Sequence, residues 1–313
     1  AHSRPPSFAR SMDRLAFLSP TEVAALSRHE REERVRLLVQ QSHNILTRAI
    51  ERHANADGRT LVGTVVLFSG GNDSTVLAHL MRDRASHAAH ANTTVGLEAT
   101  REFVRQTCRA WDLPLLEFAP PRECDHYENL VLDHGFPGPG HHFKMYQRLK
   151  ERSLEQVRRQ FVQNPYRERV VFLAGRRRTE SARRASIPAV ERRGSTVWVS
   201  PLVNWTRFDL TTYRLLNADV PVNEVTDLIH MSGECLCGSF AKPGEREELA
   251  FWFPAFEAQI QELESRIAEV PGIPDHRRRW GWGATLREPE RRRGASGPLC
   301  SSCDARFASG GAG

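Results

Sequence analysis

Residues 65–80, VVLFSGGNDSTVLAHL, constrain the fold of this 313-residue chain more than any other stretch. A short apolar run, typical of a buried strand, ends at Phe68, and apolar residues with helical spacing begin after Ser74. Two glycines and small polar residues lie between them. Such a loop lets backbone N–H groups approach an anion at the positive N-terminus of a helix. An ordinary turn with a helix cap is the simpler alternative, but we predict a phosphate site. No lysine follows the glycines, so this is not the nucleotide loop that ends in Gly-Lys-Ser/Thr.

The composition limits the class of protein. With 40% hydrophobic and 26% charged residues, the chain is expected to be globular. No apolar run reaches the roughly 18 residues of a membrane span and no signal peptide opens the chain, so we expect a cytoplasmic protein without a membrane partner. The net charge of +6 and the pI near 9.3 favour polyanionic partners. Arginines cluster at 176–193 and 277–293, with a solvated basic face as the alternative.

Strands and helices alternate along the chain. Strands are predicted at 60–68, 113–120, 169–175 and 195–201, and helices at 19–54, 74–83, 98–111, 126–135, 143–161, 206–217 and 244–270, the last broken at Pro254. This alternation predicts an α/β fold: a parallel sheet with helices on both faces. Ligands of such sheets bind beyond the carboxyl ends of the strands, where SGGNDS and GRRRTES fall. We predict an N-terminal helical segment (1–55), a nucleotide-binding α/β domain (56–230) and a C-terminal helical region with cysteines and a basic tail (231–313).

Four of the six cysteines form two close pairs. Cys235 and Cys237 are separated by one residue, and Cys300 and Cys303 by two. Four thiolates can bind zinc or an iron–sulfur cluster, so we predict that these four converge on one metal centre. Cys108 and Cys124 lack such partners and are expected to be buried or incidental.

Three segments resemble one family, in its order along the chain. FSGGNDST at 68–75 resembles the Ser-Gly-Gly-x-Asp-Ser pyrophosphatase loop (PP-loop) of adenine nucleotide alpha hydrolases. AGRRRTESARRA at 174–185 resembles the Gly-x-Arg-x-x-x-Ser-x-x-Arg segment of phosphoadenosine phosphosulfate (PAPS) reductases. SPLVNWTRFDLTTY at 200–213 is similar to that family's Pro-x-x-x-Trp-x-x-x-Asp-x-x-x-Tyr stretch, through Pro201, Trp205, Asp209 and Tyr213. Together the three segments are specific; singly only the first would be.

The resemblance implies an ATP site. Backbone groups of the loop would hold the phosphates that leave as pyrophosphate, Asp73 would ligate Mg²⁺ or orient a hydroxyl, and Arg177 and Arg184 would neutralise charge. The implied catalytic residues are Asp73, Ser69 and Arg177. The implied cofactor-binding residues are Ser69, Gly70, Gly71, Asn72, Asp73, Ser74, Gly175, Arg177, Ser181, Arg184 and Lys150. An ordinary surface lysine is the alternative for Lys150, solvated helix surface for the arginines, and core packing is favoured for Trp205 and Tyr213.

Two differences from the family's motifs indicate which branch of the family this chain resembles. The Glu-Cys-Gly-x-His nucleophile of assimilatory reductases is not found in these residues, and Lys144 and Met145 stand where some relatives carry Trp-Cys. The chain resembles most the ATP pyrophosphatase component of bacterial DNA phosphorothioation systems, which combines the loop with a cysteine-bound 4Fe-4S cluster. That resemblance implies that ATP adenylates a DNA backbone oxygen and that sulfur from a cysteine desulfurase then displaces AMP, within a complex with other modification subunits. The basic segments fit a backbone-reading partner.

Three other functions remain open. A PAPS or APS (adenosine phosphosulfate) sulfonucleotide reductase is the second interpretation, and a tRNA thiolase is the third. The alternative from a different functional class is a non-catalytic nucleic-acid-binding protein whose cysteines bind a structural zinc ion. It would keep the cysteines and the basic patches but would not need Asp73.

Overall fold

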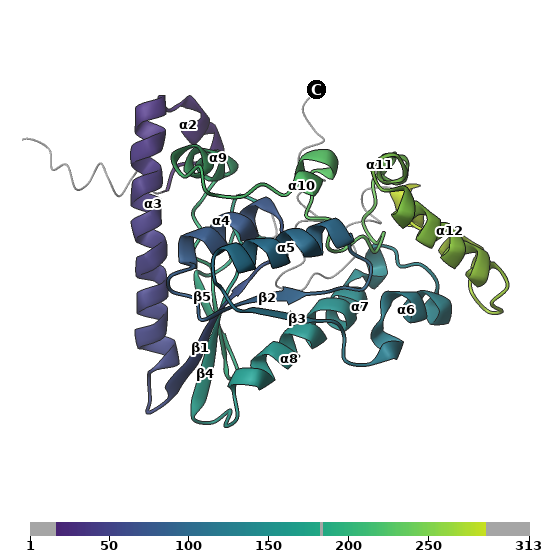
Figure 1. The fold of residues 1–313 in the computed structure, drawn as a ribbon, viewed down its shortest axis with the longest axis horizontal. Coiled ribbons are helices and arrows are strands. Elements are labelled where there is room, and N and C mark those ends of the chain that lie inside the picture. The colour runs from purple at the N-terminus through teal and green to yellow at the C-terminus, as the bar shows by residue number, and fades with distance from the viewer. Residues whose placement is uncertain (1–16, 182–183, 286–313) are drawn as a thin grey trace, which may run out of the picture. The chain divides into compact units, whose positions relative to one another are not determined.

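The computed structural model describes residues 17–181 and 184–285 (Figure 1). The strands form a six-stranded sheet in the order β3-β2-β1-β4-β6-β5. Of the strand pairs with a described register, β1–β4, β2–β3 and β4–β6 are parallel, and only β5–β6 is antiparallel. The predicted α/β fold with a parallel sheet is therefore confirmed, with one antiparallel strand at an edge. The chain divides into two compact units, each assembled from several segments.

The first unit comprises the described parts of 1–67, 73–86 and 164–221. Its strands are β1 (Thr60–Leu67), β4 (Glu168–Leu173), β5 (Val190–Arg193) and β6 (Thr196–Val199), and its helices are α2 (Pro20–Ala25), α3 (Arg28–Ala49), the π-helical turn η1 (Ile50–Ala54), most of α4 (Asn72–Met81) and α9 (Arg207–Leu216). Val66 of β1 is in register with Leu173 of β4, and Val171 with Val197 of β6. Buried β-branched residues on these central strands form the apolar layer of the unit.

The N-terminal helix is interrupted, which corrects the single helix predicted over 19–54. Ser19 caps α2 as expected, but Leu26 adopts an extended backbone and Ser27 begins a second helix. The Ser27 side chain accepts a hydrogen bond from the Glu30 backbone N–H, and the Glu30 carboxylate accepts one from the Ser27 N–H. This reciprocal cap satisfies two otherwise unpaired donors, so it starts a new helix within an uninterrupted helical sequence pattern.

The second unit comprises the described parts of 68–72, 87–163 and 222–313. It contains β2 (His87–Ala91), β3 (Leu115–Phe118), α5 (Glu98–Ala110), α6 (Tyr127–His134), α7 (His142–Tyr146), the π-helical turn η4 (Gln147–Glu151), α8 (Arg152–Phe161), α10 (Glu224–Ile229), α11 (Glu245–Trp252) and α12 (Pro254–Ala268), with the 3₁₀ turns η2 (Glu123–Asp125), η3 (Pro139–His141), η6 (Asp275–Arg278) and η7 (Trp282–Thr285). Its core includes Leu130, Leu149, Leu249, Ile260 and Trp280. The predicted break at Pro254 is confirmed, because this proline is the first residue of α12.

Candidate nucleotide site

The glycine loop follows β1, as predicted, and it is held tightly in the second unit. Gly70 has a φ of +75°, and a Cβ there would lie 2.8 Å from the Thr100 Cγ2. The Asn223 side-chain amide donates to the Gly70 carbonyl at 2.9 Å. Only glycine combines this backbone conformation with so close a neighbour. The loop is therefore a fixed backbone feature.

The first turn of α4 meets the loop after β4 within the first unit. Because β1 and β4 are adjacent and parallel, their carboxyl ends lie at the same edge of the sheet. Gly175 follows β4, and a Cβ on it would lie 3.2 Å from the Asp73 carbonyl carbon. Glycine thus allows the chain after β4 to pack directly against the start of α4. Ser74, the next residue of α4, is buried.

Asp73 and Arg177 form a bidentate ion pair. Arg177 Nε donates to Asp73 Oδ1 at 2.9 Å and Nη2 donates to Oδ2 at 3.1 Å. The side chains are 10% and 24% exposed for Arg177 and Asp73. Burial acts to lower the pKa of Arg177, but the Asp73 carboxylate outweighs it, so the pKa is raised and the guanidinium stays charged. The structure thus joins two of the predicted catalytic residues, 104 positions apart.

A second buried pair follows along the same loop. Arg184 Nη1 donates to Glu180 Oε2 at 2.5 Å, and both side chains are buried. Burial raises the pKa of Glu180, although Arg184 opposes the shift. The Ser181 hydroxyl between them is buried and has no hydrogen-bond partner among the described residues. A buried hydroxyl without a partner is unfavourable and suits a polar ligand.

Trp205 and Tyr213 pack in the core of the first unit, as favoured from the sequence. Trp205 is fully buried, and its Nε1 donates to the Ser42 hydroxyl at 3.1 Å. The Tyr213 hydroxyl lies 2.8 Å from His79 Nδ1. Asp209 caps α9 and pairs with Arg34 of α3, with oxygen–nitrogen distances of 2.8 and 3.0 Å. This motif of the family resemblance thus joins α9 to α3 and α4.

Lys150 and the first cysteine pair belong to the second unit. Cys235 and Cys237 are linked by a side-chain hydrogen bond, which together with burial raises the pKa of Cys235, while the positive charge of Lys150 acts to lower it. Lys150 therefore lies close enough to act on the cysteine loop. Its predicted phosphate contact stays a prediction.

The predicted four-cysteine centre extends beyond the part of the chain that the structure describes. Cys300 and Cys303 lie outside the described residues. Within 17–181 and 184–285, no group of three or more histidine, cysteine, aspartate or glutamate side chains could hold a metal. Cys108 is buried, as expected, and burial raises its pKa to about 12, whereas Cys124 is exposed. The convergence of the four cysteines stays a prediction.

A buried polar network anchors the cysteine loop, and sequence reasoning missed it. Glu234, directly before Cys235, accepts from the Thr93 backbone N–H at 2.8 Å and lies 2.8 Å from His90 Nε2. The other ring nitrogen of His90 lies 2.8 Å from the Phe68 carbonyl. Burial opposes ionisation of His90, but Glu234 outweighs it and raises the pKa. His90 lies in β2, an alanine-rich strand of low β-propensity that the sequence pattern does not predict. Its role therefore becomes visible only from its contacts in the folded second unit.

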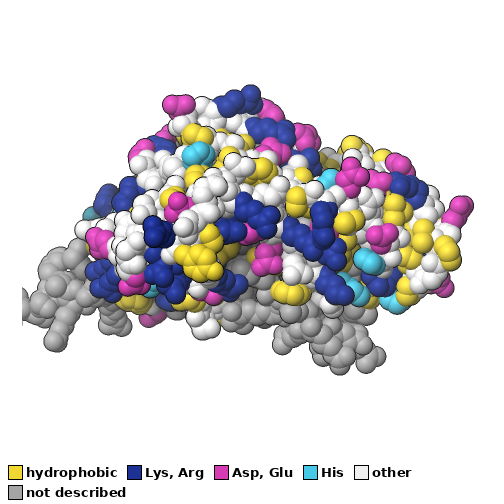
Figure 2. Space-filling model, turned by 90° about the horizontal axis from the view of Figure 1, so that it is seen from below, with side chains coloured by type: hydrophobic (Ala, Val, Ile, Leu, Met, Phe, Trp, Pro, Cys, Tyr) yellow, Lys and Arg dark blue, Asp and Glu magenta, His cyan; other side chains and the backbone are white. Residues whose placement is uncertain are grey.

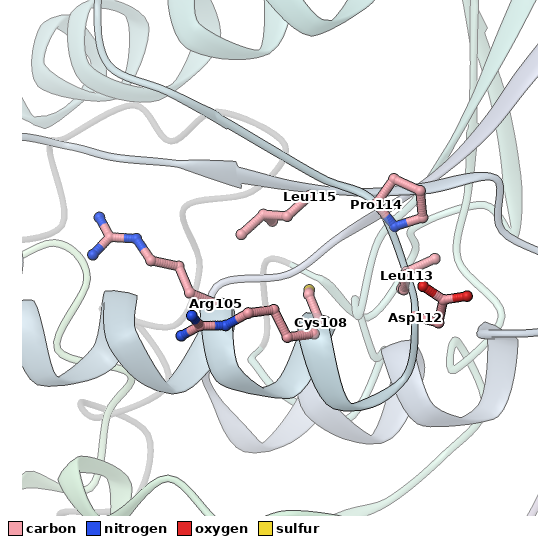
Figure 3. A pocket seen from close by; sticks show the side chains of 7 residues that line it. Arg105, Cys108, Asp112, Leu113, Pro114 and Leu115 are labelled. Carbon is pink, nitrogen blue, oxygen red and sulfur yellow. The ribbon is translucent and has the colours of Figure 1, made fainter.

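A pocket in the second unit lies at the end of α5, and it contains none of the predicted nucleotide residues (Figure 3). Its lining residues are Arg105, Cys108, Arg109, Asp112, Leu113, Pro114 and Leu115. Arg105 is paired with Glu117 at 2.8 Å and with Glu98 at 2.6 Å. We therefore assign the candidate nucleotide site to the start of α4 and the loop after β4, both in the first unit, and give this pocket no role.

Half of the described arginines in the segment 176–193 are buried. Besides Arg177 and Arg184, Arg176 is buried, donates to the Ser200 hydroxyl at 2.9 Å and lies over the Trp198 ring. Arg193 pairs with Glu191 at 2.8 Å. Figure 2 shows one face of the protein on which Lys and Arg side chains are interspersed with Asp and Glu. Three arginines of this segment, Arg176, Arg177 and Arg184, are therefore used within the unit, whereas Arg192 and Arg193 are exposed.

The fold and these residues define an α/β nucleotide-binding domain with a glycine loop between a strand and a helix. The family model of the phosphoadenosine phosphosulfate reductase domain matches residues 63–231, more than half of the chain, and the chain belongs to this family. The predicted family resemblance is confirmed, and the class is an enzyme that acts on nucleotides. None of the helices in the described part of the chain is long and apolar enough to cross a membrane.

Several solved structures resemble this chain at low sequence identity. Phosphoadenylyl-sulfate reductase from Candida auris, in a phosphate complex, is 18% identical over 72% of this chain and 94% of its own, with a TM-score of 0.42. Candida glabrata FMN adenylyltransferase with FAD and inorganic pyrophosphate is 12% identical over 70% of this chain and 69% of its own, with a TM-score of 0.43. Yeast FAD synthetase in complex with FAD is 12% identical over 91% and 99%, with a TM-score of 0.39. The comparison with curated proteins gave no match.

Proposed function

We propose that this protein cleaves ATP between the alpha and beta phosphates and transfers the AMP group to an acceptor that is then sulfurated. The observation that carries the proposal is the bidentate pair between Asp73, in the first turn of α4, and Arg177, in the loop after β4. Gly175 of the same loop packs against Asp73. A carboxylate, a charged guanidinium and a helix N-terminus at the carboxyl ends of parallel strands suit the binding and cleavage of a polyphosphate.

Each residue has a chemical role in this proposal. An acceptor oxygen attacks the alpha phosphorus, the bond to the bridging oxygen breaks, and its electron pair leaves with pyrophosphate. Arg177 and the N-terminus of α4 stabilise the negative charge that develops on the leaving group. Asp73 would hold Mg²⁺, because carboxylate oxygens are the ligands that Mg²⁺ prefers. The Ser181 hydroxyl, which has no hydrogen-bond partner among the described residues, is a donor available to the nucleotide.

ATP cleavage is tested by nucleotide chromatography after incubation with ATP and Mg²⁺. AMP and pyrophosphate are the expected products, and ADP as the only product would contradict the proposal. Asp73→Asn should lower the rate by about 100-fold, because an amide binds Mg²⁺ more weakly than a carboxylate does. Asp83→Asn is the matched control, since Asp83 is an exposed aspartate just after α4, and its rate should be unchanged.

We also propose that DNA is the acceptor and a cysteine desulfurase the sulfur donor, together with other subunits of a modification complex. The support is the resemblance of the sequence and the net positive charge of the chain. Nuclease digestion and mass spectrometry of DNA from cells with and without the gene measure the phosphorothioate content. An unchanged content after deletion would rule out this acceptor.

A 4Fe-4S cluster belongs to the same proposal, held by Cys235, Cys237, Cys300 and Cys303, with zinc as the alternative metal. Cys235 is partly buried and Cys237 is buried, and their thiols are hydrogen-bonded to each other. They suit two thiolate ligands of a soft metal, because a cation would allow both to ionise. Such a cluster would supply electron transfer. Iron, zinc and acid-labile sulfide are measured after anaerobic purification. Cys235→Ser should lower the metal content, and no bound metal in the unaltered protein would contradict this part.

Reduction of a sulfonucleotide is the second candidate, because the matching family model is that of PAPS reductase. This reaction transfers two electrons from a dithiol to the sulfate group and releases sulfite and adenosine 3′,5′-bisphosphate. Incubation with PAPS and a dithiol protein distinguishes the two functions. Sulfite release without ATP cleavage would favour the reductase.

A further inference from the structure

Three arginines contact a single carboxylate in the second unit. Asp125 is the last residue of η2, and its side chain is fully buried. Arg122 Nε donates to Asp125 Oδ2 at 2.9 Å, and Arg148 Nη1 donates to Oδ1 at 2.6 Å. Arg152 Nη1 also contacts Oδ2. Arg148 belongs to η4 and Arg152 begins α8. The Asp125 carboxylate therefore connects the segment 122–125 with the segment 148–152.

The charges of this arginine cluster do not balance. Three guanidinium groups and one carboxylate leave an excess of two positive charges. Among the described residues, no other carboxylate forms an ion pair with these arginines. Each guanidinium carries five N–H donors, and the contacts with Asp125 use few of them. The arginine side chains are 56%, 33% and 30% exposed, so a ligand in solvent can reach them.

We propose that Arg122, Arg148 and Arg152 form a binding site for a phosphate group, with Asp125 as the internal counterion that holds the guanidiniums together. A phosphate dianion would neutralise the excess charge, and its oxygens match the paired N–H groups of arginine. Asp125 keeps the mutually repelling guanidiniums together before the ligand arrives, which lowers the cost of ordering them. One arginine would be enough to neutralise Asp125, so three indicate a second anion.

This site uses no residue of the glycine loop and does not depend on ATP cleavage. The phosphate group can come from a nucleic-acid backbone or from a nucleotide. The two sources are distinguished with two probes: a fluorescein-labelled duplex of about 20 base pairs, followed by anisotropy at increasing salt, and a non-hydrolysable ATP analogue, followed by calorimetry. ATP cleavage is measured separately on each variant.

Arg122→Gln is the main variant, because Asp125 keeps two arginine partners and the fold is retained. We expect a three- to tenfold loss of affinity for one probe, and for the duplex a decrease of about one in the log–log salt slope. Arg148→Gln combined with Arg152→Gln should give a larger loss, checked for folding by circular dichroism. Loss for the duplex alone identifies backbone phosphate, and loss for the nucleotide alone identifies a nucleotide phosphate.

Arg109→Gln is the matched control. Arg109 is an exposed arginine of the same unit and forms one ion pair with Glu102. Arg109→Gln removes the same formal charge as Arg122→Gln, so it measures the effect of net charge alone. We expect this effect on the affinity to be less than twofold. Unchanged affinity for both probes in Arg122→Gln, or an equal loss in Arg109→Gln, would overturn the proposal.

Discussion

The arginines of the first unit and those around Asp125 in the second unit differ in their partners. In the first unit, Arg34, Arg177 and Arg184 are buried, and each pairs with an acid of its own. In the second unit, three partly exposed arginines share one buried carboxylate. The first arrangement gives each arginine one carboxylate partner and fixes a contact between segments. The second leaves positive charge where a ligand can reach it.

This difference shows why the number of arginines in a segment is a poor guide to a binding surface. The segment 176–193 is rich in arginine, yet its buried members are used within the unit. Arg122, Arg148 and Arg152 are scattered in sequence and were not singled out from it. A binding surface depends on the ratio of cations to anions and on exposure, and both are properties of the folded chain.

The largest expected effect is on stability in the first unit. Arg34→Ala would leave Asp209 buried without its partner and should lower the free energy of unfolding by about 3–5 kcal/mol. Urea unfolding measures the change. Arg36→Ala, an exposed arginine on the same helix, should change the free energy by less than about 0.5 kcal/mol. A loss below 1 kcal/mol for Arg34→Ala would contradict the contrast between the two units, because the buried pairs of the first unit would then not stabilise the fold.

Arg177→Ala should affect both stability and activity. Its partner Asp73 is partly exposed, so we expect a loss of about 2 kcal/mol, below the value of a fully buried pair. The rate of ATP cleavage should fall about 100-fold. Arg177→Lys keeps the charge but cannot form the bidentate contact, so it should recover stability in part and activity little. A variant that is destabilised but cleaves ATP normally would make Arg177 purely structural.

The smallest expected effect is the pH dependence of the arginine cluster. Arginine partners outweigh the burial of Asp125 and lower its pKa from 3.8 to about 2. The folded state therefore favours the carboxylate, so this contribution is present above about pH 4 and is lost as the pH falls toward about 2. Because the arginines are partly exposed, we expect about 1 kcal/mol.

Urea midpoints between pH 5 and pH 2.5 measure this contribution. Asp125→Asn should flatten the pH profile over this range, whereas Asp133→Asn, at an exposed position on α6, should leave it unchanged. Equal profiles for Asp125→Asn and the unaltered protein would show that the cluster does not depend on its carboxylate.

Much of the fold could be predicted from local patterns. The buried strand before the glycine loop, the cap at Thr206, the helix end at Gly135 and the break at Pro254 depend on neighbouring residues, so their sequence signals are strong. The strand β2 was missed because HAAHA has neither alternation nor β-branched residues, and its pairing with β3 defines it as a strand. The break before Ser27 was missed because the helical period continues across it.

The family, the α/β class and the position of the glycine loop could be predicted from the amino-acid sequence, because they depend on residues close together along the chain. The pairing of charged side chains became visible only in the folded structure. Folding joined Asp73 to Arg177, enclosed Glu234 with His90, and brought three arginines to Asp125. An ion pair requires distance and burial, and these are set by the packing of segments that the sequence separates widely.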